Sequence, residues 1–200
     1  VCNDNLLKKA SGVRIHASVT AKGQRHTGDL QITDYGVSGI PVFNISRLVA
    51  TGDTIQIDFM PGFSEEQLSN MISHLFMNGK EKSADIVLNG LFPDKIAVLF
   101  TTKLKIHNQA CHTIDKDKIS ELAGLIKNYN ISVQKRRGFE FAQVTAGGVS
   151  TDEINPKRME SKKIKNLFFA GEIIDVDGIC GGYNLHFAWA SGMIAGGNCK

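Results

Sequence analysis

The feature that most restricts the fold of this chain is the segment 167–185, with the sequence LFFAGEIIDVDGICGGYNL. The apolar run KNLFFAG, which leads into it, predicts a fully buried strand. Gly181 and Gly182 then open a predicted helix, YNLHFAWASGMIAGG, whose small residues weaken helicity but allow close approach to a sheet or a ligand. Such a strand and helix need a parallel sheet beside them, and residues 1–130 do not obviously supply one. We therefore expect this tail to close a larger α/β domain.

The first part of the chain, residues 13–60, has the alternation of apolar and polar residues that is typical of β-strands. The alternating stretches are VRIHASV, LQIT and TIQIDF, and glycines separate them as turns would. Short strands of this kind favour antiparallel pairing into a small barrel or sandwich.

At residue 64 the apolar spacing changes to that of helices. Ser64 and Gln67 form a capping box before an apolar stripe that runs to a stop at Gly79. A second helix is predicted after Pro93, and a third over residues 116–129, where Tyr129 would lie on the apolar face. We expect these stripes to form a helical core.

From residue 131 the strand period returns in ISVQ and FEFAQVTA, before AGGVS and KNLFFAG. The predicted fold class is α+β, in three parts. Residues 1–62 form a β-barrel-like part, residues 63–130 a small helical subdomain, and residues 131–200 an incomplete C-terminal portion of a Rossmann-type domain.

Composition indicates a folded chain, with 42% hydrophobic and 22% charged residues. The net charge of +3 is too small to indicate a polyanionic partner. Four cysteines without CxxC spacing and six histidines without a paired ligand motif predict no metal site. With no signal peptide and no apolar run of about 18 residues, we expect no membrane contact. Reduced thiols then fit a cytoplasmic protein.

The segment 167–185 also carries the chemistry expected of a cofactor site. Open α/β sheets bind ligands where their strands end, and Glu172 follows such an end directly. Its carboxylate can accept hydrogen bonds from ribose or ribityl hydroxyls. Gly181 and Gly182 let backbone approach a flat ligand, and the helix after them presents free N–H groups and a positive dipole end. From spacing alone, a tight strand–helix connection with surface acids explains the segment equally well.

Residue identities separate these two interpretations. The stretch NLFFAGEIIDVDGICGGYNLHFAWASGMIAG closely resembles the C-terminal FAD-binding segment of the aminoacetone-oxidase-like family of bacterial NAD(P)/FAD-dependent oxidoreductases. The stretch AQVTAGGVSTDEINPKRMES resembles the block that precedes this segment in the family. LQITDYGVSGIPVFNISR resembles a block of the family's inserted domain. The resemblance covers nearly the whole chain, in order.

What the resemblance implies is a Rossmann-type FAD domain interrupted by an insert of β-barrel and helical parts. Residues 1–130 would be the insert and residues 131–200 the return to the FAD domain. Gly171 and Glu172 would lie along the ribityl–pyrophosphate part of FAD, and Gly147 and Gly148 would line its flavin or substrate side. The isoalloxazine ring would be bordered by Gly181, Gly182, Tyr183, Asn184 and Leu185.

The sequence departs from this family in three ways. His186 stands where Gln is frequent, and Cys180 where Thr is common. The family should also open with a strand–GxGxxG–helix unit for the ADP half of FAD, and no GxGxxG occurs here. We therefore expect a fragment that carries about half of a cofactor site. No residue stands out as an acid or base catalyst.

Two hypotheses of function follow. In the first, the chain is part of a FAD-dependent oxidoreductase that passes hydride from NAD(P)H through FAD to an unsaturated or carbonyl-type small molecule, and is inactive alone. In the second, it is a non-catalytic insert domain, a lid or interaction module, unable to bind FAD by itself. Nucleic-acid binding through Lys22, Arg25, His26 and the 135–137 run is disfavoured, because these cations are scattered among acids. An orphan strand and apolar tail favour a homodimer through the C-terminal segment.

Overall fold

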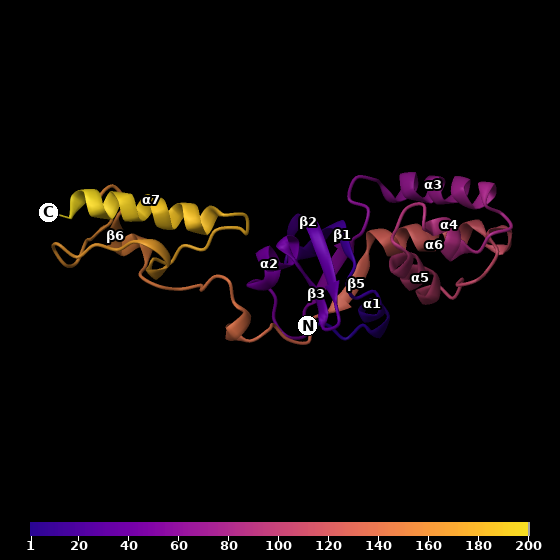
Figure 1. Cartoon of the computed structure of the whole chain (residues 1–200), viewed down its shortest axis with the longest axis horizontal. Helices are drawn as coiled ribbons and strands as arrows, with labels where there is room; N and C mark the ends of the chain where they lie inside the picture. The colour runs from indigo at the N-terminus through magenta and orange to yellow at the C-terminus, as the bar shows by residue number, and fades with distance from the viewer. Residues whose placement is uncertain (200) are drawn as a thin grey trace. The chain divides into compact units, whose positions relative to one another are not determined.

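The computed structural model describes residues 1–199, which divide into two compact units, Val1–Arg136 and Arg137–Lys200. The first unit holds a five-stranded antiparallel sheet and most of the helices (Figure 1). Its elements are α1 (Asn5–Lys9), β1 (Arg14–Ala21), β2 (Gln24–Thr33), β3 (Gly36–Gly39), α2 (Ile40–Ser46), β4 (Thr54–Asp58), α3 (Glu65–Asn78), α4 (Ala84–Leu88), α5 (Asp94–Lys103), η1 (Cys111–Thr113), α6 (Lys116–Lys127) and β5 (Tyr129–Ser132).

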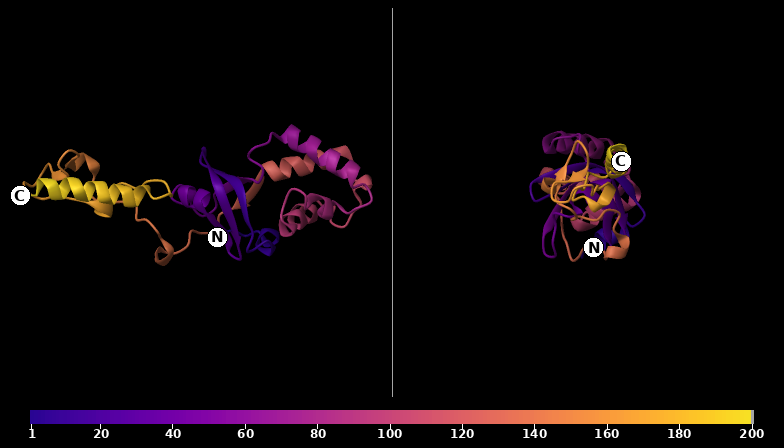
Figure 2. Two further views of the ribbon diagram at one scale, coloured as in Figure 1. Left: turned by 45° about the horizontal axis from the view of Figure 1, so that its top comes forward. Right: turned by 90° about the vertical axis from the view of Figure 1, so that its left-hand side faces the viewer.

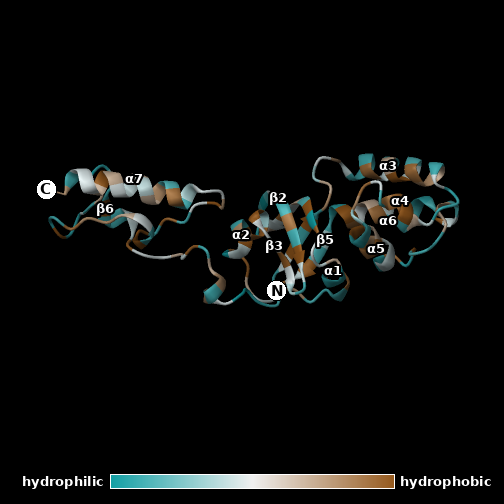
Figure 3. Cartoon of the chain, viewed as in Figure 1, coloured by the Kyte–Doolittle hydropathy of each residue, from teal (hydrophilic) through white to brown (hydrophobic). Residues whose placement is uncertain are grey.

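The sheet has the strand order β3-β2-β1-β4-β5, and it is curled like half of a barrel. β1 and β2 form a hairpin with a two-residue turn, Lys22–Gly23, in which both residues have positive φ. On β2 the apolar residues Leu30 and Ile32 are buried and Gln31 between them is exposed, and Figure 3 shows apolar and polar positions along the strands. The predicted α+β class and barrel-like part are therefore confirmed.

The helices α3, α4, α5 and α6 lie together at one end of the sheet in both views (Figures 1 and 2). The capping box predicted for α3 is present, since Gln67 N–H donates to Ser64 Oγ and Ser64 N–H to Gln67 Oε1. α5 begins after Pro93 as predicted. The prediction that α6 extends to Tyr129 is wrong: α6 ends at Lys127 and Tyr129 starts β5, because it pairs with Ile57.

One apolar core joins the sheet to these helices. At its centre the ring of Phe100 on α5 meets the rings of Phe59 and Phe92 edge-on, with centroids 5.2 Å and 5.3 Å away. Tyr129 is also fully buried, and its ring lies 5.7 Å from that of Phe59. Edge-to-face aromatic pairs stabilise beyond the area they bury. The aromatic group therefore fixes β4 and β5 against α5.

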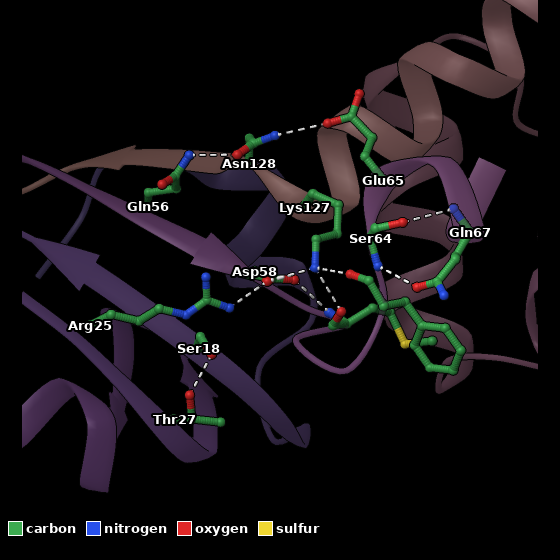
Figure 4. A network of polar contacts seen from close by, with 12 residues as sticks. Ser18, Arg25, Thr27, Gln56, Asp58, Ser64, Glu65, Gln67, Lys127 and Asn128 are labelled. Carbon is green, nitrogen blue, oxygen red and sulfur yellow. Dashed lines mark hydrogen bonds and ion pairs between the residues drawn. The ribbon is translucent and has the colours of Figure 1, made fainter.

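A network of hydrogen bonds and ion pairs connects the end of β4 to the end of α6 (Figure 4). Asp58, at the end of β4, is only 8% exposed and accepts hydrogen bonds from Lys127 Nζ at 2.8 Å and Arg25 Nη2 at 2.7 Å. Lys127 also donates to the carbonyl of Met60, at 2.8 Å. A buried carboxylate is tolerated when it is paired and fully hydrogen-bonded, so this network holds the link between sheet and helices.

The second unit has little regular structure apart from one long helix. Its elements are η2 (Phe139–Phe141), η3 (Thr151–Glu153), β6 (Ile154–Asn155), β7 (Glu160–Ser161), η4 (Gly171–Ile173) and α7 (Tyr183–Asn198). Its small core consists of the buried residues Ile154, Met159, Ile174 and Ala195.

Three predicted features of secondary structure are wrong. The stretch FEFAQVTA forms the single turn η2 and is exposed. In KNLFFAG only Phe168 pairs, in an isolated bridge with Glu160, and Leu167 is 37% exposed. In the described part of this unit only the two-residue strand β7 lies beside KNLFFAG, and no strand pairs with FEFAQVTA, so neither stretch joins an extended ladder. Within 13–60, residues 40–46 form α2, where Pro41 occupies the first turn.

Candidate functional site

The start of α7 presents free backbone donors. Gly182 is its N-cap in the left-handed conformation (φ +93°), and Gly181 before it has φ +137°. The first backbone bond into the helix is from His186 N–H to Gly182 O, so the N–H groups of Tyr183, Asn184 and Leu185 have no helical carbonyl. The helix dipole adds partial positive charge there. This end suits an anion or a polarised carbonyl oxygen.

Asn184 holds the loop that leads into α7. Its Oδ1 accepts from Gly178 N–H at 2.7 Å, and its Nδ2 donates to Gly178 O at 3.1 Å. This two-bond clamp shapes the turn that contains Gly181 and Gly182. The side-chain amide of Asn184 is therefore used within the protein.

Ser191 ties the turn after the apolar run to α7. The N–H of Gly171 donates to Ser191 Oγ at 2.9 Å, and that hydroxyl donates on to Phe187 O at 2.7 Å. Ser191 is 2% exposed, while Gly171 has φ +72° and lies near the side chain of Ala188. Glu172, which follows in η4, is exposed, so its carboxylate is free to accept hydrogen bonds from a ligand.

The glycine pair 147–148 lies against the turn that follows η4. Gly147 N–H donates to Asp175 Oδ1 at 3.0 Å, and Val149 and Ile174 form an isolated parallel bridge. A Cβ on Gly148 would lie 2.4 Å from the carbonyl oxygen of Ile173, so only glycine fits there. Two stretches that are about 25 residues apart in the sequence thus meet at one turn.

The structure thus places Gly147 and Gly148 against the turn after η4 and bonds Gly171 to Ser191 in the middle of α7, while Gly181, Gly182 and Asn184 form the turn at the start of α7. Leu185 is different, because it is 73% exposed and belongs to an apolar stripe with Trp189 and Met193. A shallow groove of about 490 Å³ follows this stripe. Sequence reasoning missed Ser191, which looks like one more small helix residue, and left Asp175 out of the site although it lies in the acid-rich segment.

The cations considered for nucleic-acid binding in the β1–β2 hairpin are neutralised by acids. Lys22 Nζ lies 2.6 Å from Asp53, and Arg25 pairs with Asp58. In the part of the chain that the structure describes, no three His, Cys, Asp or Glu side chains gather as metal ligands would. No helix among residues 1–199 has the length and apolar character needed to cross a membrane.

Comparison with known proteins matches two family models. The HI0933-like protein barrel and H2TH domain matches residues 1–144, and the HI0933-like protein Rossmann domain matches residues 125–198. The chain is 36% identical to a 3-dehydro-bile acid delta(4,6)-reductase of Clostridium scindens, over 94% of this chain and 49% of the relative. It is 30% identical to a ribosomal RNA dihydrouridine synthase of Haemophilus influenzae and 27% identical to that of Escherichia coli, over 94% and 92% of this chain and 46% of each relative.

The chain thus spans about half the length of these curated relatives. The matched models cover the sheet, the helices and the turn around α7, in the order expected from the sequence. We conclude that the chain belongs to the HI0933-like, or aminoacetone-oxidase-like, family of flavoproteins.

Proposed function

We propose that the second unit supplies one side of an FAD site in a reductase, and that Gly171, Glu172 and the Gly181–Leu185 turn contact the cofactor. The observation that carries this proposal is the glycine cap of α7, which supplies no side-chain hydrogen bond to the first N–H groups of this 16-residue helix. When bound, FAD would accept hydride from NAD(P)H and deliver it to the substrate.

Each part of the turn has a separate task in this proposal. The exposed carboxylate of Glu172 accepts hydrogen bonds from ribityl or ribose hydroxyls. The N–H groups at the start of α7 donate to the polarised N1/C2=O edge of the ring. The hydroxyl of Ser191 and the side-chain amide of Asn184 hold Gly171 and the 178–184 loop in place, and only the backbone of Asn184 faces the cofactor in this proposal. Gly147 and Gly148 border the flavin or substrate side.

The substrate class proposed here is an unsaturated compound. The names of the relatives, a delta(4,6)-reductase and two dihydrouridine synthases, both describe saturation of a carbon–carbon double bond. We therefore narrow the expected substrate from unsaturated or carbonyl-type molecules to those with a reducible C=C bond. Two of the names contain ribosomal RNA, so the sequence-based exclusion of nucleic acid loses its support.

The test is a titration of the chain with FAD, followed by the fluorescence of Trp189, the single tryptophan. This residue is 74% exposed on α7, so a flavin bound at the start of α7 will quench it by energy transfer. We expect Glu172→Gln to weaken FAD binding about tenfold, equivalent to about 1.4 kcal/mol, because a charged acceptor is lost. Glu153→Gln, which removes a surface pair with Lys163, is the matched control. Equal affinities for the two variants would contradict the proposed contact.

A second function, an interaction module or lid, is favoured by one observation. The first unit has its own continuous core from Cys2 to Val133, so it does not need the second unit to fold. Under this proposal the chain binds a partner without FAD, and the titration above gives no quenching. Self-association through α7 would accompany it, detected as a dimer in size-exclusion chromatography.

A further inference from the structure

We propose that Asp175 is a positioning residue of the cofactor site, which fixes the glycine pair 147–148 against the turn that carries Glu172. This role rests on the proposed function, which assigned no task to Asp175. The residue lies two positions after the end of η4, in the acid-rich segment between the apolar run and α7. It acts on the site indirectly, through the backbone of Gly147.

Two stretches of backbone meet at Asp175 as neighbouring strands of a parallel sheet do. Val149 N–H donates to Ile173 O at 2.8 Å, and Asp175 N–H donates to Val149 O at 2.9 Å. These two bonds form the isolated parallel bridge between Val149 and Ile174. Ile174 is 2% exposed and Val149 packs against the small core to which it belongs, so the bridge is anchored in that core.

The carboxylate of Asp175 extends this bridge by one more bond. Its Oδ1 accepts from Gly147 N–H at 3.0 Å, so the side chain and the backbone of one residue hold both ends of the stretch 147–149. Among residues 1–199 this is the only hydrogen bond of the Asp175 side chain, and no cation pairs with it. The exposed carboxylate therefore contributes a bond to the backbone and no ion pair.

The glycine pair has one closed and one open position. A Cβ on Gly148 would collide with the carbonyl oxygen of Ile173, whereas a Cβ on Gly147 would meet no atom within 4 Å. Gly147 has a φ of +95°, a conformation that favours glycine. An exposed glycine without a hydrogen bond to its N–H would have few contacts to fix its backbone. Asp175 therefore sets where the backbone beside this open space lies.

The same bridge fixes the turn that carries the exposed Glu172. This turn, η4, ends at Ile173, whose carbonyl accepts one bond of the bridge. The hydroxyl of Ser191 holds the other end of η4 through Gly171 N–H. Asp175 and Ser191 thus hold η4 from its two ends, and Glu172 and the glycine pair keep one mutual arrangement. A site whose groups are held in place in advance loses less conformational freedom when a ligand binds.

The test compares Asp175→Ala, Asp175→Asn and a control, Glu160→Ala, in the full chain. Glu160 accepts from Asn166 N–H at the same 3.0 Å in the same unit, so the control removes a matched carboxylate–backbone bond away from the turn. NMR measures the amide exchange of Gly147 in the chain without FAD, and the quenching of Trp189 measures the affinity for FAD.

We expect Asp175→Ala to speed the exchange of Gly147 about tenfold, because its N–H loses its acceptor. The same variant should weaken FAD binding about fivefold, which is the effect of one hydrogen bond. Asp175→Asn keeps a side-chain oxygen, so both values should return to within about twofold of those of the unmodified chain. Glu160→Ala should change neither value by more than about twofold, since it acts at a separate turn.

Two results would overturn the positioning role and leave the proposed function standing. Faster exchange of Gly147 with unchanged FAD affinity would mean that Asp175 only supports the local fold. Weaker FAD binding with unchanged exchange of Gly147 would mean that the carboxylate contacts the cofactor directly. Phe169 N–H, which donates to Met159 O, must keep its exchange rate in every variant, and a rise there would contradict a local role.

A third result concerns the proposed function itself. An unmodified chain whose Trp189 fluorescence does not respond to FAD would overturn that function, and the role of Asp175 in the site would fall with it. The exchange of Gly147 is measured without FAD, so this result is distinguishable from the two that concern Asp175 alone.

Discussion

The two units of this chain bury very different shares of their apolar side chains. The first unit encloses one core that reaches from Cys2 to Val133 and contains fully buried Phe59, Phe100 and Tyr129. In the second unit, as far as residue 199, the buried apolar core consists of Ile154, Met159, Ile174 and Ala195. Large apolar side chains stay exposed there, among them Phe139 at 78% and Trp189 at 74%.

This difference in burial shows which secondary structure a local sequence pattern can form without distant partners. Antiparallel hairpins and capped helices find their partners within the first 136 residues. The segment predicted as a buried parallel strand forms only the bridge of Phe168 with Glu160, and α7 leaves Leu185 and Trp189 exposed, because the described part of the second unit contains no larger sheet for them to pack against. The apolar stripe of Leu185, Trp189 and Met193 on α7 is therefore exposed to solvent.

The largest expected difference between the units appears when one aromatic ring is removed from each. Phe100→Ala should lower the free energy of unfolding by about 3–5 kcal/mol, because it leaves a cavity among Phe59, Phe92 and Tyr129. Trp189→Ala, on the exposed stripe, should change it by less than about 0.5 kcal/mol. Urea unfolding followed by circular dichroism measures both values. Similar losses would mean that α7 is buried after all.

Next in size is the network at the end of β4. Lys127→Ala should lower the free energy of unfolding by about 3 kcal/mol, because the buried carboxylate of Asp58 then keeps only one of its two cationic partners. Lys118→Ala removes a surface pair with Glu121 on the same helix, and should cost less than about 1 kcal/mol. The same unfolding assay compares the two lysines. A small loss for Lys127 would show that the sheet and helices are joined by apolar packing alone.

Within the second unit, the two glycines of the 147–148 pair should differ. Gly148→Ala places a Cβ on the carbonyl oxygen of Ile173, and should speed amide exchange at Val149 and Asp175 more than tenfold. Gly147→Ala meets no atom within 4 Å, so only its positive φ is strained, which costs about 1 kcal/mol. Hydrogen exchange followed by mass spectrometry measures both. Equal rates would contradict the close approach of the two turns.

The smallest effect concerns pH and the first unit. Burial raises the pKa of Asp4, but hydrogen bonds from Leu7 N–H and the Tyr129 hydroxyl, with the Lys103 ammonium, outweigh it and hold this pKa below its usual value. The carboxylate therefore stabilises the fold above about pH 4, and this contribution is lost as the pH falls through the lowered pKa.

Asp4→Asn keeps a side-chain oxygen to cap α1 and removes only the charge. Thermal melting between pH 7 and pH 2 should show a shallower loss of stability for this variant below about pH 4. A variant whose acid limb matches that of the unmodified chain would exclude Asp4 as the titrating group.

The sequence predicted the local structure of the first unit better than that of the second. The α3 helix was predictable because Ser64, Gln67 and Gly79 mark its ends locally. Tyr129 was assigned to the wrong element because a residue at the end of an apolar stripe can continue either a helix or a strand. The strand predicted in KNLFFAG is reduced to one bridge between Phe168 and Glu160, because an apolar run does not show how many neighbouring strands a segment has to pair with.

The glycines of the candidate site and Glu172 come from the family resemblance, and their contact with a cofactor stays a prediction. Ser191 was not predictable as a positioning residue, because its contact with Gly171 N–H crosses 20 residues and depends on the fold.

The central claim is that residues 171–185 of the second unit form the surface that contacts the FAD cofactor. Hydrogen exchange of the full chain, with and without excess FAD, tests it most directly. We predict slow exchange in the first unit in both states, and fast exchange over residues 171–185 that slows at least tenfold when FAD is added. Exchange over 171–185 that FAD leaves unchanged, or slowing confined to the first unit, would contradict the claim.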